Sequence, residues 1–387
     1  MRLVLAAASL IAVAACETAT IAPSSPEAAL DAYYATIPDS ALPRAPEGPA
    51  LPGEQTPVTR ILVGSCNDEE NESPVLQTIA GEEADLFLMV GDNVYGDRDG
   101  RAYANNDPDL TELRESFADL AARPEFRAAR AAHPMMVAWD DHDYGANDAG
   151  GDFVFRGFAE RIHEVFWGLE DEDVGAWDGT YYARRFGPEG QRVQVIMLDT
   201  RSFRSPLVPT DEWGETGKER YLPAPETRMQ DMLGAAQWTW LENQLQEPAD
   251  VRIIASSIQV LTSDGHGFEH WSNLPAERQR LFDLIDRTAA NGVVFVSGDR
   301  HTAFLYRHGE VLDYPVHELT ASSMNLSFRD ETDEQDSAQI GAGYAPVNFG
   351  AVEIDWDARE IALSVHDEDG DTVRQTRFPI PARREGA

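Results

Sequence analysis

The chain is poor in basic residues and in cysteine. Of its 387 residues, 31 are Lys or Arg, 68 are Asp or Glu and 2 are Cys, and the formal net charge is −37. The basic residues form no stripe, which argues against nucleic-acid binding, because such binding depends on neutralising phosphates. The acidic excess is typical of a solvated surface or of a protein that binds divalent cations. We therefore expect no nucleic-acid partner.

Long apolar runs are also scarce. The run Leu3–Ala15 follows Arg2, is too short to span a bilayer comfortably and is typical of a secretory signal. Small residues precede Cys16, as in a bacterial lipobox, whose cysteine is lipidated after cleavage; the alternative is an ordinary signal cut near Ala15. We predict a signal peptide at 1–15 and a linker and N-terminal segment at 16–57. The mature protein is expected to be exported, periplasmic or at the cell surface, monomeric, and held to the membrane by the lipid on Cys16 alone.

The second cysteine needs an explanation of its own. If Cys16 carries a lipid, Cys66 has no disulfide partner in a compartment where disulfides form readily. Cys66 is then either a small buried side chain or a thiolate held by a metal. Its position directly after an apolar run favours the metal.

Four apolar runs end in residue types that bind metals. The most informative is Leu86–Val90, which leads into Gly91-Asp92-Asn93-Val94-Tyr95-Gly96-Asp97. The other three are Ile61–Val63 before Gly64-Ser65-Cys66-Asn67-Asp68, Met135–Trp139 before Asp140-Asp141-His142-Asp143, and Val293–Val296 before Ser297-Gly298-Asp299-Arg300-His301. Runs of this kind are typical of buried strands. Four such ends predict one polynuclear metal centre at the carboxyl edge of a sheet.

The order of strand and helix patterns predicts an α/β fold. Strands are expected near 59–66, 84–91, 134–140, 193–199, 251–257 and 292–298, and helices near 27–36, 110–122, 153–167, 237–245 and 276–290. This alternation is typical of a sheet with crossover connections. After residue 301, short alternating runs predict a second, more antiparallel sheet that packs on the first. Segments 202–232 and 328–343 are expected to be long loops, the first long enough for an active-site wall or lid. The catalytic domain is expected to span 58–380.

The candidate ligands divide into a softer and a harder set. A carboxylate can bridge two cations, and a phenolate favours a highly charged ion such as ferric iron. The softer set consists of Cys66, Asp92, Tyr95 and His301, although Tyr95 could simply pack. The harder, all-oxygen set consists of Asp92, Asp140 or Asp141, Asn147 and Asp299, and suits Ca²⁺, Mg²⁺ or Mn²⁺. Two metals about 3.5–4 Å apart can hold a hydroxide and clamp both oxygens of an in-line displacement at phosphorus.

Three further residues are candidates for catalysis. His142 is placed to protonate the leaving alkoxide or to steady the phosphorane, although it could instead hydrogen-bond a ligand carboxylate. Arg201 and Arg300 are candidate anion clamps, because a planar guanidinium matches phosphate oxygens. Arg201 could also form a structural ion pair. Arg300 would point away from its neighbours Asp299 and His301 if the strand continues through them.

Together the four motifs resemble the alkaline phosphatase D family of calcineurin-like metallophosphatases. Four other segments support the resemblance, which covers about residues 58–325: Leu198–Arg201, Met232–Trp238, Ala255–Gln259 and Pro275–Arg278. The resemblance implies a four-layer α/β/β/α core, exported phosphatase activity and a mixed Fe³⁺ and Ca²⁺ centre, although the second metal could be Mg²⁺, Mn²⁺ or Zn²⁺.

The resemblance also implies roles for individual residues. Cys66, Asp92, Tyr95 and His301 would be the ferric ligands, and Asp92, Asp140 or Asp141, Asn147 and Asp299 the calcium side. Alignment to the Gly-Asn-His-Glu signature of simpler metallophosphatases would select Asp141 from the doublet and make His142 the catalytic histidine. Asp143 stands where Glu is usual in the family, and the chain is shorter than many members.

These observations lead to three hypotheses about function. The main one is an exported, metal-dependent phosphoesterase that hydrolyses phosphate monoesters or diesters at alkaline pH with a metal-held hydroxide. The second is a phosphodiesterase or phospholipase that acts on phospholipids, which the lipid anchor favours. The third is a non-catalytic, calcium-binding surface lipoprotein, which leaves Cys66, Tyr95 and His301 at the strand ends unexplained.

Overall fold

The computed structural model describes residues 25–210, 220–262, 267–309, 311–328 and 336–381. Its internal contacts divide the chain into two units, Met1–Pro38 and Asp39–Ala387. The first unit contains α1 (Pro26–Tyr34), which begins at the N-cap Ser25. The predicted signal and Cys16 lie outside the described residues. Within the described residues, no helix combines the length and the apolarity that crossing a membrane requires.

The second unit is built on two six-stranded sheets. Sheet A has the order β14 (Thr372–Pro379), β13 (Glu360–Asp367), β12 (Asn348–Asp355), β1 (Arg60–Gly64), β2 (Leu86–Val90), β3 (Met135–Ala138). Sheet B has the order β10 (Phe304–His308), β11 (Val316–Thr320), β9 (Val293–Ser297), β8 (Val251–Ala255), β5 (Val193–Met197), β4 (Tyr182–Phe186). A two-stranded ribbon, β6 (Val208–Pro209) and β7 (Tyr221–Leu222), stands apart from both.

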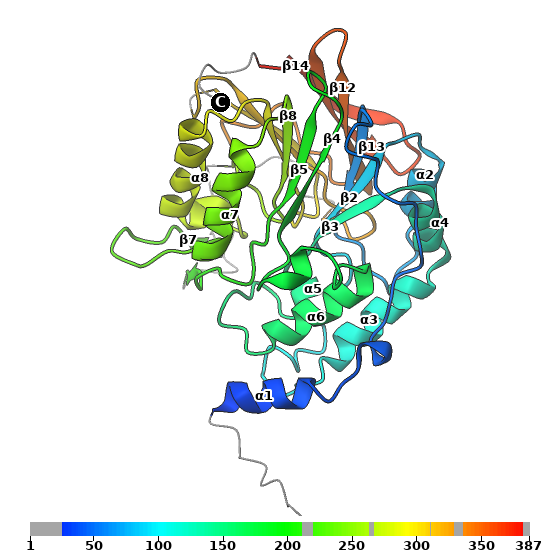
Figure 1. Ribbon diagram of the computed structural model, residues 1–387, viewed down its shortest axis with the longest axis vertical. Coiled ribbons are helices and arrows are strands. Elements are labelled where there is room, and N and C mark those ends of the chain that lie inside the picture. The colour runs from blue at the N-terminus through cyan, green and yellow to red at the C-terminus, as the bar shows by residue number, and fades with distance from the viewer. Residues whose placement is uncertain (1–24, 211–219, 263–266, 310, 329–335, 382–387) are drawn as a thin grey trace, which may run out of the picture. The chain divides into compact units, whose positions relative to one another are not determined.

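Helices lie between many of the strands along the chain. They are α2 (Pro74–Gly81), α3 (Thr111–Ala122), α4 (Pro124–Ala132), α5 (Asp141–Tyr144), α6 (Arg156–Trp167), α7 (Gly234–Gln246) and α8 (Pro275–Arg287). Short 3₁₀ turns occur at Asp39–Ala41, Val174–Ala176 and Trp271–Asn273. Figure 1 shows α7 and α8 on one side of the sheets and α2 and α4 on the other.

The two sheets pack face to face, because their strands are apolar on both faces. One core cluster joins Ile61 and Val63 of sheet A to Val195 and Val294 of sheet B. The neighbouring residue in β5, Ile196, points the other way and packs in a second cluster with α7 and α8. The result is the four-layer α/β/β/α arrangement, so the predicted fold class is confirmed.

The assignment of strands to sheets was wrong in one respect. We expected the strands before residue 301 to form one sheet and those after it a second. Instead β1, β2 and β3 belong to sheet A and β5, β8 and β9 to sheet B, and the late strands are shared between them. β12 pairs antiparallel with β1, whereas β11 pairs parallel with β9. Alternating polarity predicts that a segment is a strand, but it carries no information about which edge the strand joins.

Two glycines allow the strand ends of the two sheets to approach closely. A Cβ atom on Gly91, after β2, would lie 2.6 Å from the Asp140 Cβ, after β3. A Cβ atom on Gly298, after β9, would lie 2.5 Å from the Ser65 Oγ, after β1. Gly91 also has a φ of 103°, which favours glycine. The carboxyl ends of strands from both sheets therefore meet at one place.

Candidate metal centre

The residues that leave these strands have an unusual backbone conformation. Cys66, Asp92, Asp299 and His301 have φ angles of 56°, 50°, 66° and 54°, in the left-handed region that non-glycine residues rarely adopt. Each such residue costs on the order of 1 kcal/mol, and such residues cluster at functional sites. Their sharp turns direct four side chains from three strands towards one point.

The softer ligand set converges as predicted. The Asp92 Oδ2 lies 3.4 Å from the Cys66 Sγ and 3.3 Å from the Tyr95 hydroxyl oxygen. The same hydroxyl oxygen lies 3.4 Å from the His301 Nε2. All four residues are buried, with exposed fractions of 7% or less. A thiol, a phenol, an imidazole and a carboxylate thus share one buried point.

Neighbouring groups fix the orientation of these side chains. The His301 Nδ1 lies 2.6 Å from the carbonyl oxygen of Leu326, so Nδ1 carries the proton and Nε2 presents its lone pair to the centre. The Ser322 Oγ accepts from the His301 N–H at 2.6 Å and lies 3.0 Å from the Cys66 Sγ. Sequence reasoning missed Ser322, although it follows a strand end as the predicted ligands do.

The chemistry of this group fits a bound cation. Burial, together with the charge of Asp92, raises the pKa of Cys66 and of Tyr95 well above their usual ranges. Burial also raises the pKa of Asp92, whose Oδ1 has no hydrogen-bond partner among the described residues. Burying three acidic groups side by side is costly unless a cation neutralises them. The donor set suits a metal with affinity for both sulfur and oxygen.

Asp140 and Asp141 both reach the centre but in different settings. Asp140, Asp141 and Asp299 each offer an oxygen within 4.8 Å of the others. The Asp140 Oδ1 is held by Ser257 at 2.6 Å and by the Arg201 Nε at 2.5 Å. Asp141 belongs to three of the four possible ion-binding groups within the described residues and Asp140 to one. The geometry therefore favours Asp141 as the metal-facing member of the doublet.

Asn147 lies at the edge of this arrangement. It is exposed and lines a cavity with Asp97 and Asp148. The next residue, Asp148, makes the direct contact with the doublet, since its N–H donates to the Asp141 Oδ2 at 2.7 Å. Asp148 was not among the predicted site residues.

His142 stands beside the softer set. Its ring packs against Tyr95 at a tilt of 34°, with 4.2 Å between centroids, and its Nδ1 lies 2.7 Å from the Asp97 Oδ1. Burial alone would lower the pKa of His142, but the carboxylates of Asp141, Asp92 and Asp97 raise it well above its usual value. Asp97 was missed as a functional residue, although it closes the Gly-Asp motif in the sequence.

The two predicted anion clamps are both buried. The Arg201 guanidinium is fully buried between Asp140 and Glu269, whose Oε2 lies 2.5 Å from Nη1. This arrangement favours the structural ion pair that we gave as the alternative. Arg300 is 2% exposed, and its guanidinium lies 4.5 Å from the centre of the Phe268 ring.

Asp143 ties two of the strand ends together. Its Oδ1 accepts from the Asn93 N–H at 2.9 Å, and its Oδ2 accepts from the Asp140 N–H at 2.9 Å. A carboxylate at this position therefore fixes the loop after β2 to the loop after β3. The shorter side chain of Asp, where Glu is usual in the family that the sequence resembles, is long enough for both contacts.

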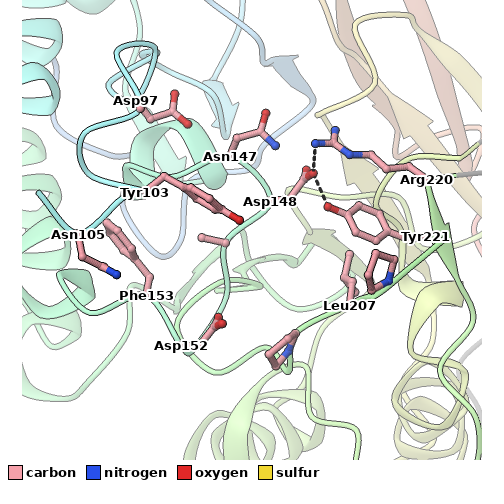
Figure 2. Close-up of a pocket in the computed structure, with 14 residues that line it drawn as sticks. Asp97, Tyr103, Asn105, Asn147, Asp148, Asp152, Phe153, Leu207, Arg220 and Tyr221 are labelled. Carbon is pink, nitrogen blue, oxygen red and sulfur yellow. Dashed lines mark hydrogen bonds and ion pairs between the residues drawn. The ribbon is translucent and has the colours of Figure 1, made fainter. Parts of the chain in front are cut away.

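A cavity of about 670 Å³ adjoins the centre. Figure 2 shows Asp97 and Asn147 at the edge nearest α5, Tyr103 and Phe153 on one wall, and Arg220 and Tyr221 on the opposite wall. This volume is within the range of small-molecule sites. The segment 202–232 thus contributes a wall, as predicted; residues 211–219, on which a lid would depend, lie outside the described residues.

The two packed sheets, flanked by helices and carrying ligand-type side chains at their joined strand ends, define an α/β fold of the metallophosphatase type. The sequence matches the PhoD-like phosphatase family over residues 61–152 and 174–361, more than half of the chain. The chain belongs to this family, whose members are classed as phosphoric ester hydrolases, and the predicted resemblance is confirmed.

Individual relatives agree with this assignment. The chain is 25% identical to alkaline phosphatase D of Bacillus subtilis (strain 168) over 284 residues, which cover 65% of this chain and 47% of the relative. It therefore spans about half the length of that relative. Among solved structures, one described as the structure of PhoD has a TM-score of 0.62 at 18% identity, covering 84% of this chain and 73% of that one. GAP50 of Plasmodium, described as the anchor in the inner membrane complex, has a TM-score of 0.51 at 12% identity, covering 85% and 91%.

Proposed function

We propose that this protein is an exported, metal-dependent phosphoesterase that hydrolyses phosphate monoesters and diesters at alkaline pH. The observation that carries the proposal is the convergence of Cys66, Asp92, Tyr95 and His301 beside the carboxylates of Asp141 and Asp299. Membership in a phosphatase family gives this centre its reaction class.

The two ligand sets support a mixed Fe³⁺ and Ca²⁺ centre. The thiol and phenol of Cys66 and Tyr95 suit ferric iron, and the carboxylates of Asp141 and Asp299 suit calcium, with Mg²⁺, Mn²⁺ or Zn²⁺ as substitutes on that side. Asp92 reaches both sets, so it is the candidate bridge. When bound, the metals would lower the pKa of a water molecule and neutralise charge on the phosphate.

The chain's own residues supply the proton and the orientation. We assign His142 as the group that protonates the leaving alkoxide, because it lies beside the proposed ligands and its Nδ1 is held by Asp97 at 2.7 Å. Asp97 accepts from Nδ1, and this leaves Nε2 as the atom that donates to the leaving oxygen. The tilted contact between the His142 and Tyr95 rings holds His142 against the ligand set.

Export and anchoring rest on the first sixteen residues. The apolar run that ends before Cys16 supports a signal peptide and a lipid anchor, and hence a place in the periplasm or at the cell surface. Replacing Cys16 by Ala should abolish incorporation of labelled palmitate while the chain is still exported. Equal labelling of both forms would contradict the anchor.

Elemental analysis with an ester panel tests the proposal. The protein purified from its native source should contain iron and a second metal, absorb visible light through thiolate and phenolate charge transfer, and hydrolyse p-nitrophenyl phosphate or its bis ester at alkaline pH. Chelation should remove this activity. Tyr95→Phe should shift or remove the visible band, whereas Tyr103→Phe, the matched control in the cavity, should leave the band unchanged. A colourless, iron-free protein of full activity would contradict the mixed-metal assignment.

A further inference from the structure

One wall of the cavity beside the centre is linked through Asp148 to the candidate metal ligand Asp141. The wall is formed by Arg220 and Tyr221, at the start of β7. Both side chains point towards Asp148, as Figure 2 shows. The Asp148 Oδ2 accepts from the Tyr221 hydroxyl at 2.5 Å and pairs with the Arg220 Nη2 at 2.8 Å.

Asp148 is fixed on its other side by its backbone. Its N–H donates to the Asp141 Oδ2 at 2.7 Å, and its carbonyl oxygen accepts from the Arg204 Nη2 at 2.6 Å. Its φ of 53° lies in the left-handed region, which Asp and Asn tolerate better than other side chains with a Cβ. One residue therefore connects Asp141 to the wall formed by Arg220 and Tyr221.

We propose that the cavity binds the organic group that stays on the phosphate when a diester is cleaved, and that Asp148 is the positioning residue that holds the cavity wall in a fixed position relative to the centre. This inference rests on the proposed phosphoesterase function and adds its substrate class. A cavity of about 670 Å³, with Tyr103 and Phe153 opposite Tyr221, takes a bulky organic group with exposed rings or carbons. Small esters would leave the cavity unfilled and would gain no binding free energy from it.

The charges of the cavity restrict this class further. Asp97 and Asp148 are already engaged by His142 and by the wall, and the exposed Asp152 adds another carboxylate to the lining. Since Arg220 is paired with Asp148, a second phosphate on the bound organic group would be repelled by the carboxylate of Asp152. The preferred substrates are therefore diesters whose retained organic group is large and carries no further phosphate.

Two matched pairs of chromogenic diesters test the inference with the metal-loaded protein. Methyl p-nitrophenyl phosphate and bis(p-nitrophenyl) phosphate share a leaving group and a charge but differ in the bulk of the retained portion. The p-nitrophenyl ester of thymidine 5′-phosphate and its 3′-phosphorylated form differ by one phosphate. The variants are Asp148→Asn, which preserves the left-handed backbone, and Tyr221→Phe; Asp171→Asn, an exposed Asp away from the cavity lining, is the control.

We expect the wild type to have the lower KM for the bulky member of the first pair and for the unphosphorylated member of the second. Asp148→Asn and Tyr221→Phe should raise the KM of the bulky ester by about 10-fold to 150-fold, the range expected when a hydrogen bond to a charged group is lost. The KM of the methyl ester and both kcat values should stay within about 3-fold of the wild type, as should all values of Asp171→Asn.

Three outcomes overturn the inference in distinguishable ways. If the metal-loaded wild type hydrolyses neither p-nitrophenyl phosphate nor either ester of the first pair, the proposed function fails and this inference fails with it; if it hydrolyses p-nitrophenyl phosphate alone, only this inference fails. If the wild type hydrolyses both esters of the first pair, but Asp148→Asn and Tyr221→Phe change the two KM values by the same factor, the phosphoesterase function stands and the assignment of the cavity is wrong.

Discussion

Replacing Asp97 by Asn perturbs the proposed proton donor without removing it. In the structure the Asp97 Oδ1 lies 2.7 Å from the His142 Nδ1, and Asp97 is only 8% exposed. The carboxylate stabilises the imidazolium form and fixes the proton on Nδ1. An amide at this position keeps the volume, removes the negative charge and can present its NH₂ group to the ring instead of its oxygen.

The size of the effect follows from this contact. A hydrogen bond to a charged group contributes roughly 1.5–3 kcal/mol, and one pKa unit corresponds to about 1.36 kcal/mol. Asp97→Asn should therefore lower the pKa of His142, because the imidazolium loses a charged hydrogen-bond partner. It should lower kcat for alkyl esters by about 10-fold to 100-fold, as expected for loss of a partner that orients a functional histidine.

The direction in which the kcat profile shifts with pH follows from the role of His142, which acts in its protonated form. His142 acts as an acid, so activity on alkyl esters is lost as the pH rises through its pKa. A lower pKa moves the alkaline limb of the kcat profile to lower pH. Esters of p-nitrophenol, whose leaving group departs as a stable anion, need less protonation and should show a smaller loss.

The assay compares an alkyl phosphate with p-nitrophenyl phosphate across the alkaline range, for wild type, Asp97→Asn and His142→Asn. Asp171→Asn is the matched control, and thermal unfolding confirms that each variant is folded. If Asp97→Asn lowered kcat for both esters by the same factor and left the alkaline limb of the kcat profile at the same pH, His142 would not be the proton donor. The double variant Asp97→Asn/His142→Asn should lose less kcat than the two single losses combined, because residues that act as one unit do not contribute additively. Additive losses would also refute the reasoning.

Two further predictions concern stability. Arg201→Met should lower the free energy of unfolding by about 3–5 kcal/mol in urea titrations, because it leaves Asp140 and Glu269 buried without their shared guanidinium; a loss below about 1 kcal/mol would contradict the ion pair. His163 is fully buried, and burial lowers its pKa to about 3. Since the folded state resists protonation, this residue should reduce stability as the pH falls from 7 towards 3, by about 3 kcal/mol at pH 4. His163→Phe should remove this contribution to the fall in the free energy of unfolding at acid pH. If the free energy of unfolding fell equally with pH in the two proteins, His163 would not be protonated on unfolding.

Much of the fold could be predicted because its strands are buried on both faces. The six strands expected before residue 301 coincide with β1, β2, β3, β5, β8 and β9. The helices α2 and α4 and the strand β4 were missed. Each is short, and β4 (Tyr-Ala-Arg-Arg-Phe) carries two arginines, so its apolar signal is weak. The pairing of β1 with β12 could not be predicted, because local patterns do not encode partners far apart in the chain.

The site could be predicted where a ligand follows a strand directly. Cys66 and Asp92 come together because β1 and β2 are parallel neighbours in sheet A, whereas His301 reaches them from the end of β9 in sheet B, a meeting of two sheets that the sequence did not predict. Residues that act through other residues were missed: Asp97 and Ser322 lie in turns that look like ordinary polar loops, and Glu269 is distant in sequence from every motif. Their roles depend on contacts with His142, Cys66 and Arg201, which only the folded chain brings about.

The position of β1 in sheet A has a consequence for how this protein is made. β1 carries Cys66 at its end and lies between β2 and β12, so Ile61 faces Leu86 on one side and Val352 on the other. During synthesis the ribosome must deliver nearly 300 more residues before this strand acquires its second neighbour. The Cys66 thiol is therefore among the earliest parts of the two-sheet unit to be synthesised and among the last to be enclosed, and a nonsense mutation ahead of residue 348 would leave it on an open edge.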